Sequence, residues 1–432
     1  MRISSLQAFN NGVQGLQRNY AEAIRTQQQI SSGNRILTPA DDPVASVRLM
    51  QLEQQQNMLG QYKDNLSAAN SSLMQEESVL NSVNNIMQRV RELAGEAGNG
   101  ALSQNERQAI ASELQEREDE LLGLMNTRNA RGEYLFAGFQ GKTQPFERQA
   151  DGSYAYHGDE GQRTLQIGSS LNIAVGDNGK KVFENITNAA RLSSGWTEVD
   201  PANPVQPLAG STLAFSAPLI QDEVTYSGTP AFPASGIVVR FGDPAAVPPE
   251  DPKEYEVFAS PYTAGDPVLQ SGRLDSDDAR PDSFAFRGMT LQFEGVPVGG
   301  ESVTIESIPN SEKQGVLDTI HQLRMALENN TDSPEGKRDT RSAVAAALTN
   351  IDHAMINIDS SRGDIGARMN VIETTLNNNE DVALVNKSVQ AELREIDYPE
   401  ALSKLAFQSI VLEAAQQSFV KISQLNLFDK IR

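Results

Sequence analysis

The segment "LGQYKDNLSAANSSLMQEESVLNSVNNIMQRV" (residues 59–90) decides the fold class of this 432-residue chain. Apolar residues recur in it every seven positions, and a second apolar row is offset from the first by three. The first row is Leu52, Leu59, Leu66, Leu73, Leu80, Met87 and Ala94; the second is Tyr62, Ala69, Val83 and Val90, with Glu76 in one place of the row. This heptad pattern predicts one long helix packed against other helices. Gly95, Gly98 and Gly100 are expected to end it.

Three further segments of the chain show helical periodicity. A second helix is expected at Ile110, Leu114, Leu121 and Leu124, and a short one around Leu317, Ile320, Leu323 and Leu327. A long C-terminal row is formed by Val344, Leu348, Ile351, Met355, Ile358, Ile365, Met369, Ile372 and Leu376, and after a phase shift by Val382, Val385, Val389, Leu393 and Ile396. The outer faces of these helices are polar, so we expect a bundle rather than helices buried on all sides.

Proline separates the middle of the chain from its flanks. Of 20 prolines, 16 lie between Pro145 and Pro309, and an interior proline costs a helix about 3 kcal/mol. The stretches "GIVVRFGD", "KEYEVFAS", "GMTLQFEG" and "ESVTIES" within this middle alternate as strands do. The predicted fold is mainly α with an inserted β-rich domain, its long antiparallel helical bundle or coiled-coil rod built from both chain ends. The predicted parts are terminal helices (1–45 plus 397–432), a helical rod (46–140 plus 311–396) and an inserted outer domain (141–310).

Composition argues against several classes of function. The chain has no cysteine, and its three histidines, His157, His321 and His353, are far apart in sequence. Thiolate chemistry is excluded, and a histidine metal cage or catalytic triad is not expected. We therefore predict neither a cofactor nor an enzyme.

Charge and hydropathy limit the partners. The net charge of −21 argues against nucleic acid and anionic membranes. Residues 1–50 carry +2 and residues 397–432 are neutral, which leaves −23 on the middle. No segment approaches the roughly 20 apolar residues of a membrane span, and the first residues lack the core of a signal peptide. We expect no membrane insertion and no cleaved signal.

Each chain end is predicted to form an amphipathic helix with an apolar stripe. The stripes contain Leu6, Phe9, Val13, Leu16, Tyr20 and Ile24 at the start, and Leu402, Leu405, Leu412, Phe419 and Ile422 at the end. Because a lone helix of this length is marginal in water, each end needs a partner. Two alternatives stay open: the ends pair as a two-helix stalk of a monomer, or they pair with other copies of the chain. A membrane-surface role is disfavoured, since neither polar face is rich in Lys or Arg.

A break separates the first helix from the long one, in "QISSGNRILTPADDPVAS" (residues 29–46). Gly33 or Asn34 can adopt the left-handed conformation that ends a helix. Asp42 is placed to cap the next helix, with Pro43 in its first turn, and Asp41 would interact favourably with the helix dipole. Capping explains Asp42 without metal binding or catalysis.

Two motifs carry a resemblance to a known family. The break resembles the N-terminal signature of the bacterial flagellin superfamily, through Gly33, Arg35, Asp41, Asp42 and Pro43. The stretch "NTRNARGEYLFAGFQGKTQPF" (residues 126–146) is similar to the exit from the rod in the superfamily's hook–filament junction proteins. The matching residues of this rod-exit motif are Gly132, Tyr134, Leu135, Phe136, Gly138, Pro145 and Phe146. The segment 287–305 and the last 32 residues also resemble the superfamily, whereas residues 147–284 resemble nothing that we can name.

The resemblance implies a structural adaptor joining hook to filament, located outside the cell on the bacterial flagellum and exported without a cleaved signal peptide. Implied partners are identical subunits in a ring, the other junction protein, flagellin, the flagellar export apparatus and a cytoplasmic export chaperone. The terminal helices would line the inner tube and the β domain would face outward.

Two alternatives to the junction adaptor remain. One is a filament flagellin, which the segment Tyr134 to Phe146 argues against. The other is an adhesin or enzyme housed in the insertion, where carboxylates are numerous. The loop "DSDDARPD" (residues 275–282) has a composition like that of a calcium loop but lacks its spaced ligands and glycine.

Overall fold

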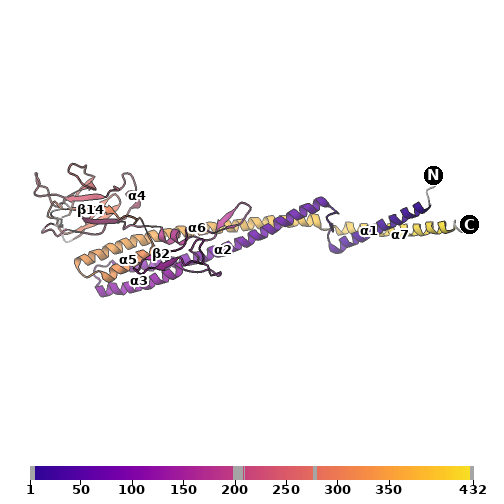
Figure 1. The fold of residues 1–432 in the computed structure, drawn as a ribbon, viewed down its shortest axis with the longest axis horizontal. Helices are drawn as coiled ribbons and strands as arrows, with labels where there is room; N and C mark the ends of the chain where they lie inside the picture. The colour runs from indigo at the N-terminus through magenta and orange to yellow at the C-terminus, as the bar shows by residue number, and fades with distance from the viewer. Residues whose placement is uncertain (1–4, 198–207, 209, 276–279, 429–432) are drawn as a thin grey trace. The chain divides into compact units, whose positions relative to one another are not determined.

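The computed structural model describes residues 5–197, 208, 210–275 and 280–428. Its helices are α1 (Ser5–Ser32), α2 (Pro43–Ala97), α3 (Gln104–Met125), the π-helix η1 (Lys180–Glu184), α4 (Glu223–Tyr226), α5 (Val316–Asn329), α6 (Pro334–Arg394) and α7 (Tyr398–Phe428). Its strands are β1 (Phe146–Arg148), β2 (Tyr154–Tyr156), β3 (Thr164–Gln166), β4 (Asn172–Ala174), β5 (Ile186–Thr187), β6 (Leu192–Trp196), β7 (Ala214–Phe215), β8 (Leu219–Ile220), β9 (Ile237–Phe241), β10 (Glu254–Ala259), β11 (Gln270–Arg273), β12 (Asp282–Phe286), β13 (Met289–Glu294), β14 (Ser302–Ser307) and β15 (Lys313–Gln314). Figure 1 labels most of the helices and two of the strands. The predicted fold class, long helices from both flanks with an inserted β-rich region, is confirmed.

The chain divides into two compact units. The terminal unit contains Met1–Ser67, Gln166–Leu171 and Val371–Arg432, and the middle unit contains Ala68–Leu165 and Asn172–Asn370. The long helices α2 and α6 each contribute one part to each unit. None of the helices in the described residues has the length and apolarity of a membrane span.

The helical part of the middle unit is built around the predicted apolar rows. From α2, Leu73, Leu80 and Met87 are completely buried. The other helices of this unit also carry buried apolar residues: Leu114 and Leu121 of α3, Ile320 and Leu323 of α5, and Ile351, Ile358 and Ile365 of α6. The ion pairs Arg91–Asp352 and Arg362–Glu77 show that α2 and α6 run antiparallel. Burying one such side chain contributes roughly 1.5–3 kcal/mol, so this seam is a strong source of stability.

Local sequence signals explain where α2 ends and where α3 begins. Helix α2 ends at Ala97, within the predicted glycine cluster. Helix α3 begins after Ser103, whose hydroxyl accepts a hydrogen bond from the backbone of Glu106 while the Glu106 carboxylate accepts one from the backbone of Ser103. This reciprocal capping box satisfies two backbone donors that the helix itself leaves free.

The β-rich region of the middle unit is a two-sheet sandwich. One sheet has the strand order β11-β10-β9-β14-β6, and the other is β12-β13-β7 with β8 also paired to β13. All of these pairs are antiparallel. Apolar side chains from the two sheets share one core, including Val239, Phe241, Phe284, Phe293 and Ile305. The four strands expected from alternation correspond to β9, β10, β13 and β14.

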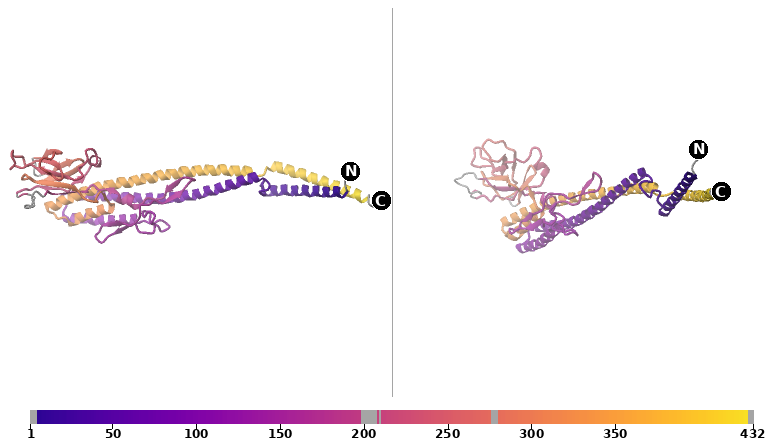
Figure 2. Two further views of the ribbon diagram at one scale, coloured as in Figure 1. Left: turned by 45° about the horizontal axis from the view of Figure 1, so that its top comes forward. Right: turned by 45° about the vertical axis from the view of Figure 1, so that its right-hand side comes forward.

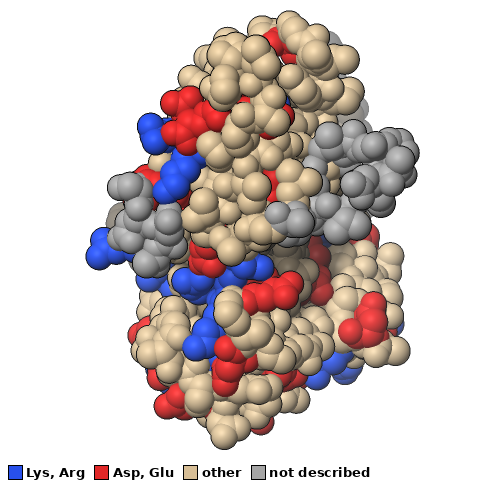
Figure 3. Space-filling view, turned by 90° about the vertical axis from the view of Figure 1, so that its left-hand side faces the viewer, with Lys and Arg blue, Asp and Glu red and all other residues tan. Residues whose placement is uncertain are grey.

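The surface of the molecule seen in Figure 3 has no region of a single charge sign. Acidic and basic side chains are interspersed on this face, and much of it is uncharged. The strong negative charge of the sequence therefore does not form one acidic patch there.

The terminal unit consists of two successive antiparallel helix pairs. Helices α1 and α7 contact each other along their length, as the views in Figures 1 and 2 also show. Next to them, the first part of α2 pairs with the last part of α6, where Glu53 faces Arg394 and Lys63 faces Glu380. The chain ends thus pair with each other within one molecule.

Candidate assembly interface

A corner joins the two helix pairs of the terminal unit. Gly33 follows the last residue of α1 with φ of +71°, in the left-handed region that favours glycine. A Cβ at this position would lie 3.2 Å from the hydroxyl oxygen of Tyr398. Gly33 is therefore required both by the backbone conformation and by the close approach of α7.

The two chain segments at this corner are hydrogen-bonded to each other. The Arg35 amide donates to the carbonyl of Arg394 at 2.7 Å, and the Ile396 amide donates to the carbonyl of Gly33 at 3.0 Å. The Arg35 guanidinium also donates to the carbonyl of Leu393 at 3.0 Å. Residues 33–35 and 393–396 are thereby held together like two short strands.

Asp42 and Asp41 have different structural roles. The Ala45 amide donates to Asp42 Oδ1 at 2.9 Å, so Asp42 caps α2, which begins at Pro43. Asp41 instead closes the preceding loop, because Oδ2 accepts from the amides of Leu37 (2.9 Å) and Thr38 (3.0 Å). These bonds, above all that from the Thr38 hydroxyl, lower the pKa of Asp41. Asp41 also pairs with Arg25.

The predicted apolar stripes of the chain ends are only partly covered. Half-buried residues are Val13, Leu16 and Ile24 of α1 and Leu405, Leu412 and Phe419 of α7. Tyr20 and Leu402 are exposed by 57% and 53%. The side chains of Leu6, Phe9 and Ile422 lie outside the described ones.

Two large exposed residues of α7 were not among the predicted interface residues. Phe407 and Ile410 are 68% and 65% exposed. The signal that could have identified them is composition, since the segment 401–415 is apolar on more sides than one heptad row accounts for. Pairing of α1 with α7 therefore leaves a large apolar area on the terminal helices without cover in the described chain.

The rod-exit motif lies in the middle unit and is a packing motif. Phe136 and Phe146 are completely buried, and both rings pack edge-on against Phe183, at centroid distances of 5.0 and 5.9 Å. Tyr134, Leu135 and Pro145 are also buried. The motif thus anchors the chain where it leaves α3.

Backbone geometry explains the two glycines Gly132 and Gly138 of this motif. Gly132 and Gly138 have φ of +79° and +68°. A Cβ at Gly138 would lie 2.3 Å from Asp159 Oδ1. The Asn126 side chain exchanges two hydrogen bonds with the backbone of Phe146, at 2.9 and 3.0 Å, and so joins the end of α3 to β1.

Buried carboxylates are the main feature that sequence reasoning missed. Glu118 of α3 is fully buried and accepts hydrogen bonds from Tyr154 (2.5 Å) and Arg324 (2.9 Å). Glu76 of α2 accepts one from the backbone of Asp177 at 2.9 Å. Burial, followed by the charge of Asp177, raises the pKa of Glu76 to about 8. Its position within the apolar heptad row was the available signal.

The groups considered for metal binding or catalysis have ordinary structural partners. Within the described residues, no three His, Asp or Glu side chains gather in a way that suits a metal ion. His353 Nδ1 lies 2.9 Å from the carbonyl oxygen of Thr187, and His321 lies beside Arg324. Half of the acidic loop "DSDDARPD", residues 276–279, falls outside the described residues.

Comparison with known proteins gives matches at both ends of the chain. The sequence model of the bacterial flagellin N-terminal helical region matches residues 3–141, and that of the C-terminal helical region matches residues 348–429. Paired N- and C-terminal regions of this kind define a structural protein of the flagellum, and the chain belongs to the bacterial flagellin superfamily.

Within the superfamily, the chain is similar to flagellar hook-associated protein 3. That protein of Salmonella typhimurium is 34% identical over 190 residues, which cover 44% of this chain and 59% of the relative. The crystal structure of flagellar hook associated protein-3 from Legionella pneumophila matches with a TM-score of 0.61 and 25% identity, over 80% of this chain and 98% of that one. A flagellin of Clostridium tyrobutyricum is 22% identical over 416 residues, 96% of this chain and 97% of the relative. The alignment to the Salmonella relative spans about three-fifths of that protein.

Proposed function

We propose that the chain is a structural adaptor of the bacterial flagellum, joining hook to filament in the manner of hook-associated protein 3. The observation that carries this proposal is the incompletely covered apolar surface of α1 and α7, on a chain whose sequence and fold are similar to that protein. Several large apolar side chains exposed together on paired helices are typical of assembly surfaces.

Subunit contacts in this proposal are made by the terminal helices. The assembly residues are those of the two stripes named above, with Phe407 and Ile410 added. The corner at Gly33, Arg35, Asp41, Asp42 and Pro43 fixes how α1 and α2 follow each other, and the rod-exit motif fixes the start of the insertion. The division into terminal helices (1–45 plus 397–432), rod (46–140 plus 311–396) and outer domain (141–310) is part of the proposal.

The proposed partners are copies of the chain in a ring, the other junction protein on one side and flagellin on the other. Before assembly, the chain would pass the flagellar export apparatus and bind an export chaperone in the cytoplasm. The absence of cysteine from the sequence suits export of an unfolded chain, since no disulfide has to form or break.

The first test uses cells that lack this chain. We expect hooks without filaments in electron micrographs, with flagellin released into the medium. The full-length chain should restore filaments, whereas a chain without residues 400–432 should stay folded by circular dichroism but fail to restore them. Normal incorporation of the truncated chain, or normal filaments in its absence, would contradict the proposal.

A filament flagellin is the second candidate, favoured by the nearly full-length match to a flagellin. Purified protein separates the two functions. A filament flagellin polymerises alone into long filaments, whereas a junction protein stays in short assemblies under the same conditions.

A further inference from the structure

The contact between α2 and α6 in the terminal unit places several amide side chains beside apolar ones such as Leu59 and Ala383. Amide side chains line the seam: Asn379 and Asn386 on α6, and Gln56 on α2. Asn386 is only 7% exposed, and Asn379 Nδ2, Asn386 Nδ2 and Gln56 Oε1 are buried without a hydrogen-bond partner among the described residues. A buried amide that lacks a partner costs about 1–3 kcal/mol, so this seam is weak.

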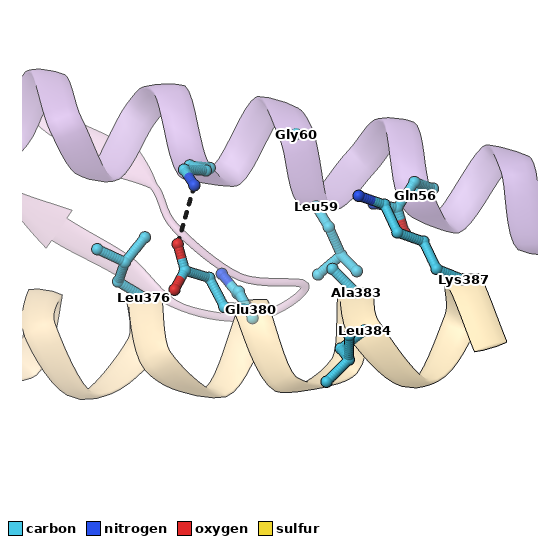
Figure 4. A pocket seen from close by; sticks show the side chains of 10 residues that line it. Gln56, Leu59, Gly60, Leu376, Glu380, Ala383, Leu384 and Lys387 are labelled. Atoms are coloured by element: carbon cyan, nitrogen blue, oxygen red, sulfur yellow. Dashed lines mark hydrogen bonds and ion pairs between the residues drawn. The ribbon is translucent and has the colours of Figure 1, made fainter.

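Two valines of α6, in contrast, are largely exposed to solvent. The phase-shifted row Val382, Val385 and Val389 was expected to pack with the other helices, but Val382 and Val385 are 41% and 60% exposed. At 100° per residue, Val382, Val385 and Val389 lie roughly 40–120° around α6 from Asn379 and Asn386. Figure 4 shows the groove between the two helices, with Leu59 pointing from α2 toward Ala383 of α6.

A matching apolar row lies outside the seam on α2. Val44, Val47 and Met58 are exposed by 80%, 53% and 42%, and with Gln51 and Gln54 they follow a 3-4-3-4 spacing. At 100° per residue, Val44, Val47 and Met58 lie roughly 60–120° around α2 from Leu59. Both helices therefore present a coiled-coil-like row to the outside of the pair.

The charges beside the two rows are complementary. Arg48 stands beside the α2 row, and it has no ion pair among the described residues. Asp381 and Glu392 stand on the same face of α6 as Val385, four and seven positions away, and the described chain gives them no cationic partner either. The exposed residues also continue into α7 at Tyr398 and Leu402, the start of the proposed assembly surface.

We propose that a second copy of this chain covers these rows, with the α2 row (Val44, Val47, Met58) of one copy packed on the α6 row (Val382, Val385, Val389) of its neighbour. This contact rests on the proposed function, and it extends the assembly surface from the terminal helices onto α2 and α6. Burial of the two rows between copies adds apolar contact to helices whose own seam is weak. Arg48 of one copy forms an ion pair with Asp381 of the other.

Cysteine crosslinking tests the contact directly, because the natural chain has no cysteine. The variant V47C/V385C replaces the wild-type chain in the bacterium, and its isolated flagella are oxidised. A disulfide within one chain is excluded: Lys63 faces Glu380 and Glu53 faces Arg394, so residues 47 and 385 are about 16 Å or more apart along the pair, beyond the reach of a disulfide. We expect products at multiples of the 47.0 kDa chain.

Three matched variants accompany this one. V47C and V385C alone should stay monomeric, and V224C/V385C, with the 82% exposed Val224 of α4, should give at least tenfold less dimer. Dimers from V385C alone, or a crosslink to a different protein, would overturn the proposed contact. The absence of crosslinks in flagella that carry normal filaments would also overturn the proposed contact, but it would leave the proposed function intact. The proposed function is contradicted by a different result, namely normal attachment of filaments in cells without the chain.

Charge reversal tests the register of the contact. R48D and D381R should each reduce the V47C/V385C crosslink several-fold, and the two together should restore it. A double variant as poor as the single ones would contradict the pairing of Arg48 with Asp381.

Discussion

Helices α2 and α6 form a seam in each of the two units, and the two seams have opposite designs. In the middle unit, Leu73, Leu80 and Met87 of α2 are completely buried together with Ile351, Ile358 and Ile365 of α6. In the terminal unit, amides without hydrogen-bond partners among the described residues share the seam with Leu59 and Ala383, and Val382 and Val385 are exposed. We infer that the first arrangement is stable in an isolated chain, whereas the second gains stability when something covers its outer rows. One pair of helices thus combines a folded support with a surface prepared for assembly.

Leucine truncation should separate the two regions most strongly. Leu80→Ala creates a cavity in the middle unit and should lower the free energy of unfolding by about 2–5 kcal/mol. The matched variant Leu384→Ala, at a residue that is 69% exposed, should change it by no more than about 0.5 kcal/mol. Urea unfolding of the two purified variants measures both values, and equal losses would remove the distinction between the regions.

A pH titration should reveal the buried carboxylate in the middle unit. Because burial raises the pKa of Glu76 to about 8, the folded chain holds a proton that the unfolded chain releases near its ordinary value. The stability that this proton provides is complete at acidic pH and is lost as the pH rises toward and through 8, by up to about 1.4 kcal/mol per pH unit.

Glu76→Gln removes this titration and should flatten the decline in stability between about pH 5 and pH 8. Some slope should remain from Glu184, since burial and the nearby Asp318 raise its pKa to about 7. Glu113→Gln, at a surface carboxylate paired with Arg89, serves as the control and should keep the wild-type slope. Urea unfolding at several pH values gives the comparison; a Glu76→Gln slope equal to that of the wild type would show that Glu76 is ionised in the folded chain.

Replacing a buried amide of the α2–α6 seam by an apolar residue should stabilise the terminal unit. Asn386→Leu removes an amide whose Nδ2 is buried without a partner among the described residues, and should stabilise the α2–α6 pair of the terminal unit by about 1–2 kcal/mol. Amide hydrogen exchange of residues 376–394 measures the change. Faster exchange in the variant would mean that Asn386 makes a contact which stabilises the seam.

Loss of the helix cap should give the smallest of these effects. Asp42→Ala removes the acceptor for the Ala45 amide and should cost about 1 kcal/mol, whereas Asp42→Asn preserves a capping oxygen and should be close to neutral. Exchange of the first amides of α2 reports the difference. If the two variants behave alike, the cap is not what fixes the start of the helix.

These contrasts also explain what the sequence could predict. Heptad spacing identified α2 and α6, proline and alternation identified the β insertion, and glycine and Asp-Pro placed the corner between α1 and α2. The periodicity of Leu73 and Leu80 resembles that of Val382 and Val389, yet only the leucines are buried. Periodicity identifies an apolar face but cannot say which element covers it, because burial depends on the register of a partner far away in sequence.

For the candidate assembly interface, the sequence predicted the apolar stripes but not which of their residues are exposed. The stripes of the chain ends were visible in the sequence, and the structure pairs α1 with α7. The exposure of Phe407 and Ile410 depends on how these helices face each other. The different roles of Asp41 and Asp42 depend on the loop conformation at Leu37 and Thr38, which local residue preferences do not determine.

Hydrogen exchange of the free monomer and of the assembled protein tests the central claim most directly. In the monomer, amides of residues 376–394 should exchange at least a hundredfold faster than those of residues 351–365, although both segments belong to α6. In the assembled protein, the first segment should become as protected as the second. Equal, strong protection of both segments in the monomer, unchanged by assembly, would contradict the account.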